Sequence, residues 1–579
     1  MNNVIDLPTR RECAPLPSDF EMKADGWVHR VIDDGEGNRR TVPVCSEIRV
    51  LALPRDRSGT GWGRLVEVID PDGNAHRWAI PASMFAGDGI EMRARLLDLG
   101  LRIAPGGAAR NALADLLQRW QPPDRATTTD RLGWSDETCT TFTLGDGRTL
   151  GSGQVVYQAE TVASVAAAMV AAGTLEGWRE HVARACTDNP LMIVAVSLAL
   201  AGPLLEPLGM DGGGIHLRGE SSRGKSTIQR VAVSVWGAPG FLGSWRATAN
   251  GLEGQAMACN STLLALDEIG EVSAKEVGNA VYMLGNGQGK TRSDRTGQAR
   301  AQKRWRAPIL SSGEISLADK MAEDGRRVAA GQNVRLLDAS ADTGRYGAFD
   351  HLHGEADGAA FSDRLRVATA TNYGTAGPAF VAALLDNLDA AKVTVREAME
   401  AFNRDAVELH GTDADGQTTR AAARLALIAA AGEMATGFDL TGWPQGAARD
   451  AAMHVLGLWI DGRGGAGPTE AREAIERVRA FLVAHGDSRF ELLDAGMGSR
   501  PSVYNRAGWR DGLTYFIAPS AWAEIHRGAD PQRAARYIID AGFLEPGDGR
   551  NLTRRMSSTV PGRPRAYAIK GDIMGADNV

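Results

Sequence analysis

Length, composition and charge already narrow the class of protein. The chain has 579 residues, enough for roughly three or four domains of ordinary size. Its formal net charge of -7 means that any contact with nucleic acid has to come from local basic patches. The five cysteines include no C-x-x-C pair, which argues against a zinc site and against a disulfide framework.

The sequence carries no membrane signal. The N-terminal stretch MNNVIDLPTRRECAPLP has no apolar core of the signal-peptide kind, and no run reaches the ~18 apolar residues that a membrane span needs. The most apolar segment, residues 191–205, is broken by Gly202 and Pro203, so we expect it to form a buried helix. We therefore predict a cytoplasmic protein without membrane contact.

Residues 1–160 are predicted to form an α+β module. Short β-like runs alternate with turn signals, and the Asp-Gly pairs at 72–73 and 146–147 predict hairpins. Residues 82–103 and 108–121 have the apolar period of helices. The module shows no catalytic constellation and no primase-like acidic cluster, so its role stays open.

The rest of the chain is predicted to contain three further parts. In residues 161–345, strands and helices alternate as in an α/β ATPase core. Residues 346–465 are helical in pattern, as expected of a helical lid, and a glycine-rich linker covers 461–470. Residues 466–579 have the order helix, helix, hairpin of a winged-helix-like domain.

A phosphate-binding loop is the strongest local signal. The stretch GGGIHLRGESSRGKS is an apolar strand followed by G-x-x-x-x-G-K-S, in which backbone N–H groups and the next helix face a phosphate group. Lys225 would reach the β and γ phosphates of ATP, and the Ser226 hydroxyl would bind Mg²⁺. The predicted nucleotide-binding residues are Gly219, Glu220, Ser221, Ser222, Arg223, Gly224, Lys225, Ser226 and Thr227.

The second half of such a site is an apolar strand that ends in acidic residues. STLLALDEIG supplies it, with Asp267 expected to hold Mg²⁺ and Glu268 expected to polarise the attacking water. The third apolar strand, RAPILSSGE, would lie between the other two in ATPases of the additional-strand class. Its γ-phosphate sensor would be Ser312 or Ser311, with Glu314 as a weaker alternative.

The same class places an arginine before the next strand, where it reaches the nucleotide of a neighbouring subunit. GQNVRLLDA offers Arg335, and Arg326 and Arg327 compete with it. Such an arginine stabilises transition-state charge and is worth several orders of magnitude in rate.

A basic insert precedes the sensing strand. Residues 290–306 carry seven basic side chains and one acid, between glycines, which favours a projecting hairpin that follows a phosphate backbone. A solvated loop or a loop that binds an acidic partner is the alternative. The predicted DNA-binding residues are Lys290, Arg292, Arg295, Arg300, Lys303 and Arg304.

Taken in order, seven segments resemble one known family. They are GIHLRGESSRGKST, LLALDEIGE, VYMLGNGQGKTR, ILSSGE, GQNVRLLDA, HGEADGAAFSDRL and TTRAAARLALIAAAGE. Together with GWVHRV and the RLGW of residues 131–134, they are similar to the bacterial family catalogued as domain of unknown function 927. That family is allied to the cassette-chromosome helicases of mobile genetic elements.

The resemblance implies an AAA+ ATPase that forms a ring, hexameric in the manner of its class, and acts as a self-loading replicative helicase of the minichromosome-maintenance type. It implies ATP and Mg²⁺ as cofactors and single-stranded or forked DNA as partner, with priming left to a separate primase or polymerase. The basic insert then corresponds to a hairpin that lines the central pore. The resemblance also implies a lid arginine, for which Arg420 is the first candidate and Arg424 the second.

Two functions from different classes stay open. The leading hypothesis is an ATP-driven DNA translocase; the alternative is an AAA+ protein remodeller or a regulatory ATPase of defence or transcription control. Peptide-pulling loops are aromatic, whereas this insert is basic and has Trp305 as its one aromatic residue, which favours DNA. The C-terminal hairpin adds Arg550, Arg554, Arg555, Arg563 and Arg565, for which DNA contact and protein contact are both open.

Overall fold

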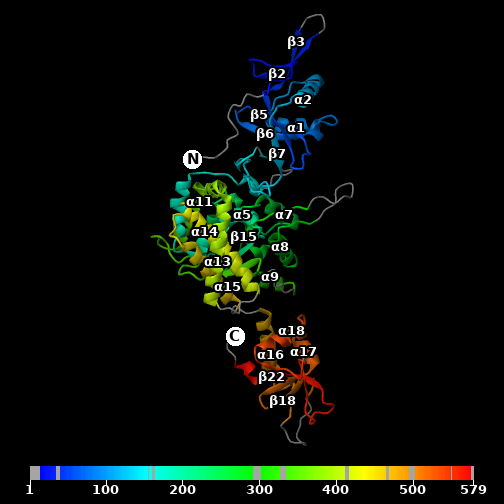
Figure 1. Ribbon diagram of the computed structural model, residues 1–579, viewed down its shortest axis with the longest axis vertical. Coiled ribbons are helices and arrows are strands. Elements are labelled where there is room, and N and C mark those ends of the chain that lie inside the picture. Colours follow the sequence, from blue (N-terminus) through cyan, green and yellow to red (C-terminus); the bar gives the residue numbers. More distant parts are fainter. Residues whose placement is uncertain are drawn as a thin grey trace. The chain divides into compact units, whose positions relative to one another are not determined.

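The computed structural model describes residues 14–33, 39–153, 155–158, 164–290, 302–325, 334–410, 416–463, 469–493, 503–549 and 551–575. The chain is a mixed α/β protein with a parallel sheet and a helical region after it (Figure 1). Its backbone divides into two compact units. They are Met1–Phe402 with Ala423–Val455, and Asn403–Ala422 with Leu456–Val579.

The N-terminal module is built on a five-stranded sheet of order β11-β7-β4-β5-β6, in which β4, β7 and β11 run parallel. Two three-stranded sheets, β1-β2-β3 and β10-β9-β8, accompany it. The strands are β1 (Phe20–Met22), β2 (Trp27–Asp33), β3 (Arg39–Ser46), β4 (Ile48–Arg55), β5 (Gly63–Ile69), β6 (Ala75–Pro81), β7 (Arg125–Thr129), β8 (Gly133–Trp134), β9 (Thr141–Thr143), β10 (Thr149–Gly151) and β11 (Val155–Tyr157).

Both hairpins predicted from Asp-Gly pairs are confirmed, because residues 72–73 connect β5 to β6 and residues 146–147 connect β9 to β10. The helix predicted over 108–121 is α2 (Gly107–Arg119), whose leucines fill the core of the module. The helix predicted over 82–103 is too long. The stretch AGDG divides it into a 3₁₀ turn, Ala82–Phe85, and α1 (Ile90–Asp98), since glycines do not favour a continuous helix.

A five-stranded, all-parallel sheet of order β13-β14-β15-β12-β16 forms the centre of the first unit. The third apolar strand of the sequence, β15, lies between the other two, as predicted. The strands are β12 (Gly213–Arg218), β13 (Gly243–Ser244), β14 (Leu264–Asp267), β15 (Pro308–Gly313) and β16 (Leu336–Ser340). The helices are α3 (Ser164–Ala167), α4 (Leu175–Trp178), α5 (Pro190–Leu208), α6 (Lys225–Val233), α7 (Ala249–Ala258), α8 (Ala274–Asn286) and α9 (Leu317–Ala322).

Helix α5 is the one described helix that is long and apolar enough to cross a membrane, and 83% of its apolar window is buried inside the protein. It is the buried helix that the sequence predicted. The expectation that Gly202 and Pro203 break it is wrong, because the helix continues through Pro203 and Pro207.

Two tryptophans explain how the prolines are tolerated. A proline lacks an N–H, so it leaves the carbonyl four residues earlier without its helical donor. Pro203 thereby frees the carbonyl of Ala199, which accepts a hydrogen bond from Trp236 Nε1 at 2.8 Å. Pro207 frees the carbonyl of Pro203, which accepts one from Trp134 Nε1 at 2.7 Å. Both bonds are buried, so each indole replaces a missing backbone donor.

The region after β16 is helical, as predicted. It consists of α11 (Gly358–Thr371), α12 (Ala376–Asp386), α13 (Leu388–His410), α14 (Gly416–Gly437) and α15 (Ala447–Gly462). Part of the predicted linker, residues 464–468, lies outside the described residues. The chain continues with α16 (Thr469–His485).

The C-terminal module has the predicted order of two helices followed by a hairpin. Helices α17 (Pro519–Ile525) and α18 (Pro531–Asp540) precede β20 and β22, and α16 packs on α18. Its sheet has the order β17-β18-β19-β22-β20, with β21 paired to β22. The strands are β17 (Phe490–Leu492), β18 (Gly508–Asp511), β19 (Thr514–Ile517), β20 (Leu544–Glu545), β21 (Arg554–Arg555) and β22 (Arg565–Lys570).

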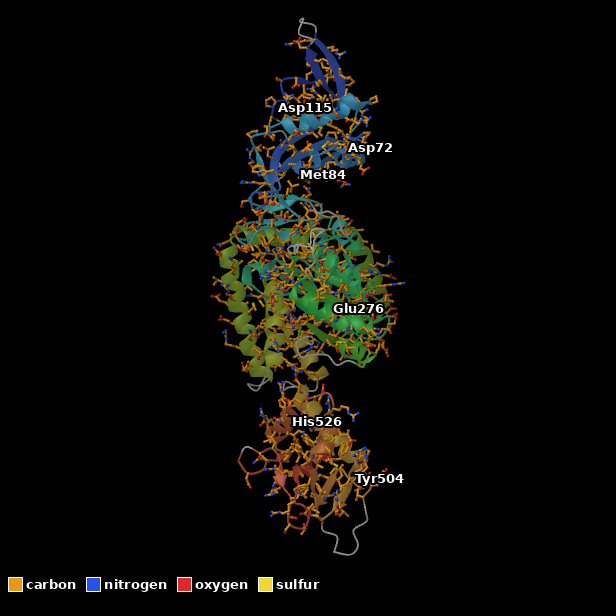
Figure 2. All side chains as sticks on the ribbon, turned by 90° about the vertical axis from the view of Figure 1, so that its right-hand side faces the viewer. Asp72, Met84, Asp115, Glu276, Tyr504 and His526 are labelled. Atoms are coloured by element: carbon orange, nitrogen blue, oxygen red, sulfur yellow. The ribbon has the colours of Figure 1, made fainter. Side chains whose placement is uncertain are left out.

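One histidine is buried in the core of this module (Figure 2). His526 is 1% exposed, and its ring lies 4.5 Å from that of Trp522, which stacks on Tyr567. Neither ring nitrogen has a hydrogen-bond partner among the described residues. Burial lowers the pKa of His526 from 6.5 to about 4, so the ring is neutral near pH 7.

We expect Trp134→Phe to destabilise the first unit by about 1–3 kcal/mol, because a buried carbonyl loses its donor. In a Pro207→Ala background the cost should fall, since alanine at this position restores the helical N–H to that carbonyl. Urea unfolding of the four proteins in this cycle measures the coupling, and the cycle of Trp236→Phe with Pro203→Ala is the matched test. Equal costs of Trp134→Phe in both backgrounds would contradict the explanation.

We expect the C-terminal module to lose stability in mild acid. The pKa of His526 is lower in the folded state than in the unfolded state, so its contribution is complete above pH 6.5 and declines as the pH falls toward about 4. At pH 5 the loss is about 2 kcal/mol. Hydrogen exchange of α17 and α18 at pH 7.5 and pH 5 measures it, and His526→Phe should remove most of the difference. An identical acid response in the variant would rule out this origin.

Candidate nucleotide-binding site

The predicted phosphate loop lies at the carboxyl end of β12 and leads directly into α6. Gly224 has φ +95°, and a Cβ on it would lie 2.7 Å from the ring of Phe349, so glycine is required for two independent reasons. Ser222 also has positive φ, +62°. The loop therefore has the tight curvature that points backbone N–H groups toward an anion at the start of a helix.

Lys225 and Ser226 occupy the first turn of α6. Lys225 is 8% exposed, and its ammonium donates to the carbonyls of Gly219 and Glu220, each at 2.6 Å, so it lies within the loop. Ser226 is exposed. The predicted binding residues from Gly219 to Thr227 thus form one continuous structure.

The acidic pair follows β14 at the same edge of the sheet. Gln229 of α6 donates to the carbonyl of Leu266 at 3.0 Å and so fixes the helix to this strand. Glu268 has φ +57°, a left-handed conformation that is unfavourable for a residue with a side chain. Its carboxylate accepts from the N–H of Gly270, whose carbonyl accepts from Lys320. The backbone at Glu268 is therefore held from two sides.

The two candidate sensor serines have different environments. Ser312 donates to Asp267 Oδ1 and accepts from the N–H of Glu268 at 3.3 Å, which joins the sensing strand to the acidic pair. Glu314 is exposed. This geometry favours Ser312 for contact with a γ-phosphate group.

Ser311 is fully buried, as Ser312 is, but it bonds to a different set of side chains. Trp245 Nε1 donates to Ser311 Oγ at 2.9 Å, and Ser311 lies 2.9 Å from Nδ1 of His216. Burial lowers the pKa of His216, so its ring is neutral and Nε2 donates to the carbonyl of Ile315. The sequence alone left the two serines equivalent because both end the same strand.

The donor set fits Mg²⁺. Ser226 in the first turn of α6 and Asp267 at the end of β14 both offer oxygen atoms at the carboxyl edge of the sheet, and Mg²⁺ is commonly held by one or two protein oxygens together with phosphate groups and water. No group of three or more His, Cys, Asp or Glu side chains that could hold a metal by itself occurs among the described residues.

The one predicted arginine that the structure describes, Arg335, is not brought to the phosphate loop of the same chain. Arg335 precedes β16, at the amino end of the sheet, where it donates to Asn286 and its guanidinium lies 4.6 Å from the centre of the Tyr282 ring. The loop lies at the carboxyl end, about 17 Å away for strands of this length. Arg326 and Arg327 lie outside the described residues.

The two lid candidates also differ. Arg424 donates to the carbonyls of Val334 and Gly212, and burial lowers its pKa to about 10, so it is a structural contact at the amino end of the sheet. Arg420 is exposed on α14.

The described ends of the basic insert pair with each other. Gln288 forms an antiparallel bridge with Arg304, and Gly289 donates to the carbonyl of Lys303 at 2.9 Å, as the predicted hairpin requires. Lys290, Lys303 and Arg304 are exposed, whereas Trp305 is 2% exposed. Arg292, Arg295 and Arg300 lie outside the described residues.

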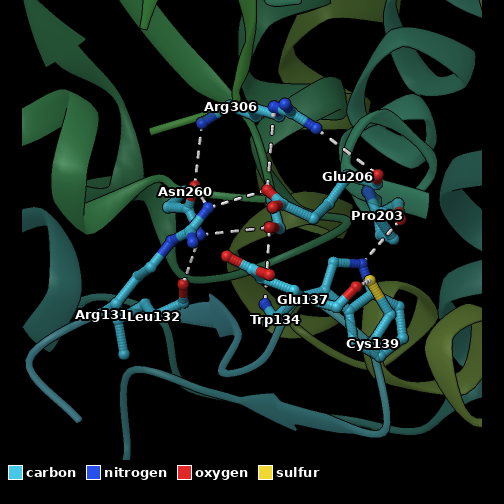
Figure 3. Close-up of polar contacts among 10 residues, drawn as sticks. Arg131, Leu132, Trp134, Glu137, Cys139, Pro203, Glu206, Asn260 and Arg306 are labelled. Atoms are coloured by element: carbon cyan, nitrogen blue, oxygen red, sulfur yellow. Dashed lines mark hydrogen bonds and ion pairs between the residues drawn. The ribbon is translucent and has the colours of Figure 1, made fainter. Parts of the chain in front are cut away.

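A polar cluster that sequence reasoning missed anchors this hairpin stem (Figure 3). Asn260 accepts from Arg131 at 3.2 Å and from the N–H of Arg306 at 2.8 Å, and it donates to the carbonyl of Leu132 at 2.6 Å. Glu206 accepts from Arg131 at 2.8 Å. The RLGW segment, the end of α5 and the stem therefore meet at one asparagine.

Gly133 permits this meeting. A Cβ on it would lie 2.4 Å from the carbonyl oxygen of Asn260, and its φ is +75°. The only sequence signal for the cluster is the RLGW motif itself, since Asn260 and Glu206 stand in unremarkable surroundings.

Comparison with known proteins identifies relatives of the chain. Residues 20–304 match the family described as "Domain of unknown function (DUF927)". A solved structure described as "SCCmec type IV Cch - active helicase" is similar with a TM-score of 0.69 and 17% sequence identity, over 97% of this chain and 99% of that chain. No curated protein matches. The family resemblance inferred from the seven segments is confirmed, and the likeness to the solved structure shows the fold.

We expect alanine substitutions of Ser311 and Ser312 to have different effects on ATP hydrolysis. Ser312→Ala should lower the rate of ATP hydrolysis per folded protein by about 10- to 1,000-fold, the range for loss of one positioned polar group. It should also cost about 1–3 kcal/mol of stability, because Ser312 is fully buried and bonded to Asp267 and Glu268. Ser311→Ala should cost about 1–3 kcal/mol of stability, because the side chains of His216 and Trp245 lose their hydrogen-bond partner. Hydrolysis by the folded Ser311→Ala protein should stay close to wild type. Hydrolysis rates and urea unfolding of both variants decide, and the reverse pattern would assign the sensor to Ser311.

Proposed function

Since residues 20–304 of this chain belong to the DUF927 family, we propose that the protein is an ATP-driven DNA translocase, a ring-forming replicative helicase of a mobile genetic element. The observation that carries the proposal is the meeting of Asp267, Glu268 and Ser312 beside the phosphate loop, with the basic hairpin directly before the Ser312 strand.

The first step is nucleotide binding. Backbone N–H groups of residues 219–224 and the Lys225 ammonium neutralise the phosphates of ATP, and Ser226 and Asp267 would hold Mg²⁺, which would supply further positive charge. Because the Lys225 ammonium already lies within the loop, little reorganisation is needed when the phosphates enter.

Hydrolysis then needs a water molecule positioned in line with the γ-phosphate. Glu268 orients this water. Ser312 donates to the Asp267 carboxylate and accepts from the backbone N–H of Glu268, and these two hydrogen bonds connect the acidic pair to the sensing strand, β15. A change at the γ-phosphate alters the contact that Ser312 makes, and this change is passed to β15, the strand that follows the basic hairpin.

The position of Arg335 supports a ring. In one chain it lies at the end of the sheet opposite to the phosphate loop, so it can complete only the site of a neighbouring copy. An arginine that completes the site of the neighbouring subunit makes every site equivalent only when the copies close into a ring, and a hexamer is such a ring.

DNA is the proposed cargo because of the hairpin stem. Lys290, Lys303 and Arg304 are exposed and carry charge that suits a phosphate backbone. Trp305, which could grip a peptide, is buried and donates to the carbonyl of Leu284, which disfavours the protein-remodeller alternative.

The C-terminal module adds a second basic surface. Its topology supports a winged helix, with α18 as the recognition helix and β20 to β22 as the wing. Arg554 and Arg555 are exposed, Arg563 and Arg565 donate to carbonyls of the wing, and Arg550 lies outside the described residues. DNA contact here is a proposal of its own.

The decisive experiment measures ATP hydrolysis with and without single-stranded DNA. We expect DNA to accelerate hydrolysis by the wild type, and the triple variant Lys290→Ala, Lys303→Ala, Arg304→Ala to lose most of this ratio, because the charges that couple DNA to the sensing strand are gone.

The matched control is Arg366→Ala with Arg396→Ala, which removes exposed positive charge from α11 and α13. It should keep the wild-type ratio. If DNA changes the rate of none of these proteins, the translocase proposal fails and the remodeller alternative replaces it.

A further inference from the structure

The N-terminal module presents an exposed tryptophan between two arginines. Trp62, just before β5, is 40% exposed, which is unusual for the largest apolar side chain. The guanidinium carbons of Arg55 and Arg125 lie 5.4 and 5.8 Å from the centre of its ring. Arg55 has no carboxylate partner among the described residues, so its contact is the ring.

A polar cleft adjoins this group. It has a volume of about 610 Å³ and lies at the carboxyl ends of β4, β7 and β11, the three parallel strands of the module. Its wall includes Gly61, next to Trp62, and Arg57, Thr128 and Ser135. Crevices at the carboxyl ends of parallel strands are the usual place for ligands in α/β sheets.

Two polar atoms in the lining lack partners. The Nε of Arg131 and the Oε1 of Gln158 are buried and make no hydrogen bond within the described part of the chain. Arg131 is held in place by Glu206 and Asn260, so its free donor is fixed. Both atoms are themselves covered by protein, so they mark a polar wall of the cleft that a ligand reaches only when these side chains move.

Two acids near the cleft accept hydrogen bonds within their own turns, and a third, Asp130, is exposed in the wall of the cleft. Asp56 accepts from Ser58 Oγ and from the N–H and hydroxyl of Thr60, which lowers its pKa. Asp136 likewise accepts from Thr138 and Thr140. Asp56 and Asp136 remain ionised, but among the described residues only Arg57 lies at ion-pair distance from one of them, 3.7 Å from Asp136, and neither Arg55 nor Arg125 forms such a pair.

We propose that Trp62, Arg55, Arg125 and the adjoining cleft form a binding site for single-stranded DNA. A base stacks on the indole or on a guanidinium plane, the adjoining polar cleft receives a base edge, and Arg55 and Arg57 face the phosphate backbone. The site needs bases that are unstacked, so it selects a single strand over a duplex. It goes beyond the proposed translocation, because it requires no ATP and assigns a role to a module without catalytic residues.

The test is binding of a fluorescent oligothymidine to the full chain without nucleotide, followed by anisotropy. Stacking of one base is worth about 1–3 kcal/mol, so Trp62→Leu should weaken binding by about 5- to 100-fold. Trp62→Phe keeps an aromatic face and should recover most of the affinity. Circular dichroism and thermal unfolding of both variants show that the module is folded.

Two further variants sharpen the result. Arg55→Gln with Arg125→Gln should weaken binding and reduce the dependence of affinity on salt, since fewer counterions are released. Trp27→Leu removes the other tryptophan of the module that lies beside an arginine, Arg102 at 5.5 Å, and should bind as the wild type does. Two competitors complete the test. A duplex of the same sequence tests whether the site prefers a single strand, and an oligouridine tests whether it distinguishes the sugar.

The outcomes are distinct from those of the ATPase test. Unchanged affinity of folded Trp62→Leu, or equal loss in Trp27→Leu, overturns the proposal even if DNA still stimulates hydrolysis through the hairpin. A duplex that competes as well as the single strand also overturns it. Trp62-dependent binding with no stimulation of hydrolysis supports the site while the translocase proposal fails.

Discussion

The insertion of β15 between β12 and β14 is the constraint on which the site depends. Parallel pairing on both sides fixes Ser312 opposite Leu217 and Ser311 opposite Leu266, so one serine faces Asp267 while its neighbour enters the core. Because adjacent residues of a strand point to opposite faces, one position separates a serine bonded to the acidic pair from one bonded to His216 and Trp245, and both are fully buried.

A second constraint joins the N-terminal module to the parallel-sheet core. Helix α5 contains two prolines beyond its first turn, and the carbonyls they free are capped by Trp134 and Trp236. Asn260 completes the junction by bonding both the RLGW segment and the stem of the basic hairpin. Buried polar groups of this kind are costly when unpaired, so the junction is specific as well as stable.

The distribution of charge explains how a chain with a negative net charge could bind the proposed nucleic-acid partner. Positive charge is concentrated at the hairpin stem and beside Trp62, while nearby carboxylates such as Asp56 are engaged in their own turns. Local fields of this kind act within about a Debye length, so the overall charge of -7 does not oppose them strongly.

The sequence by itself determined the phosphate loop, the acidic strand end, the hairpins and most helices, because these follow from residue type and spacing within a short stretch. The different partners of Ser311 and Ser312, the capping of the α5 prolines and the Asn260 cluster are visible only in the tertiary structure. Each joins residues such as Trp134 and Pro203 that are far apart in the chain, and local propensity carries no information about such pairings. The same reason explains why α5 continues through Pro203: the donors that make this possible come from other elements.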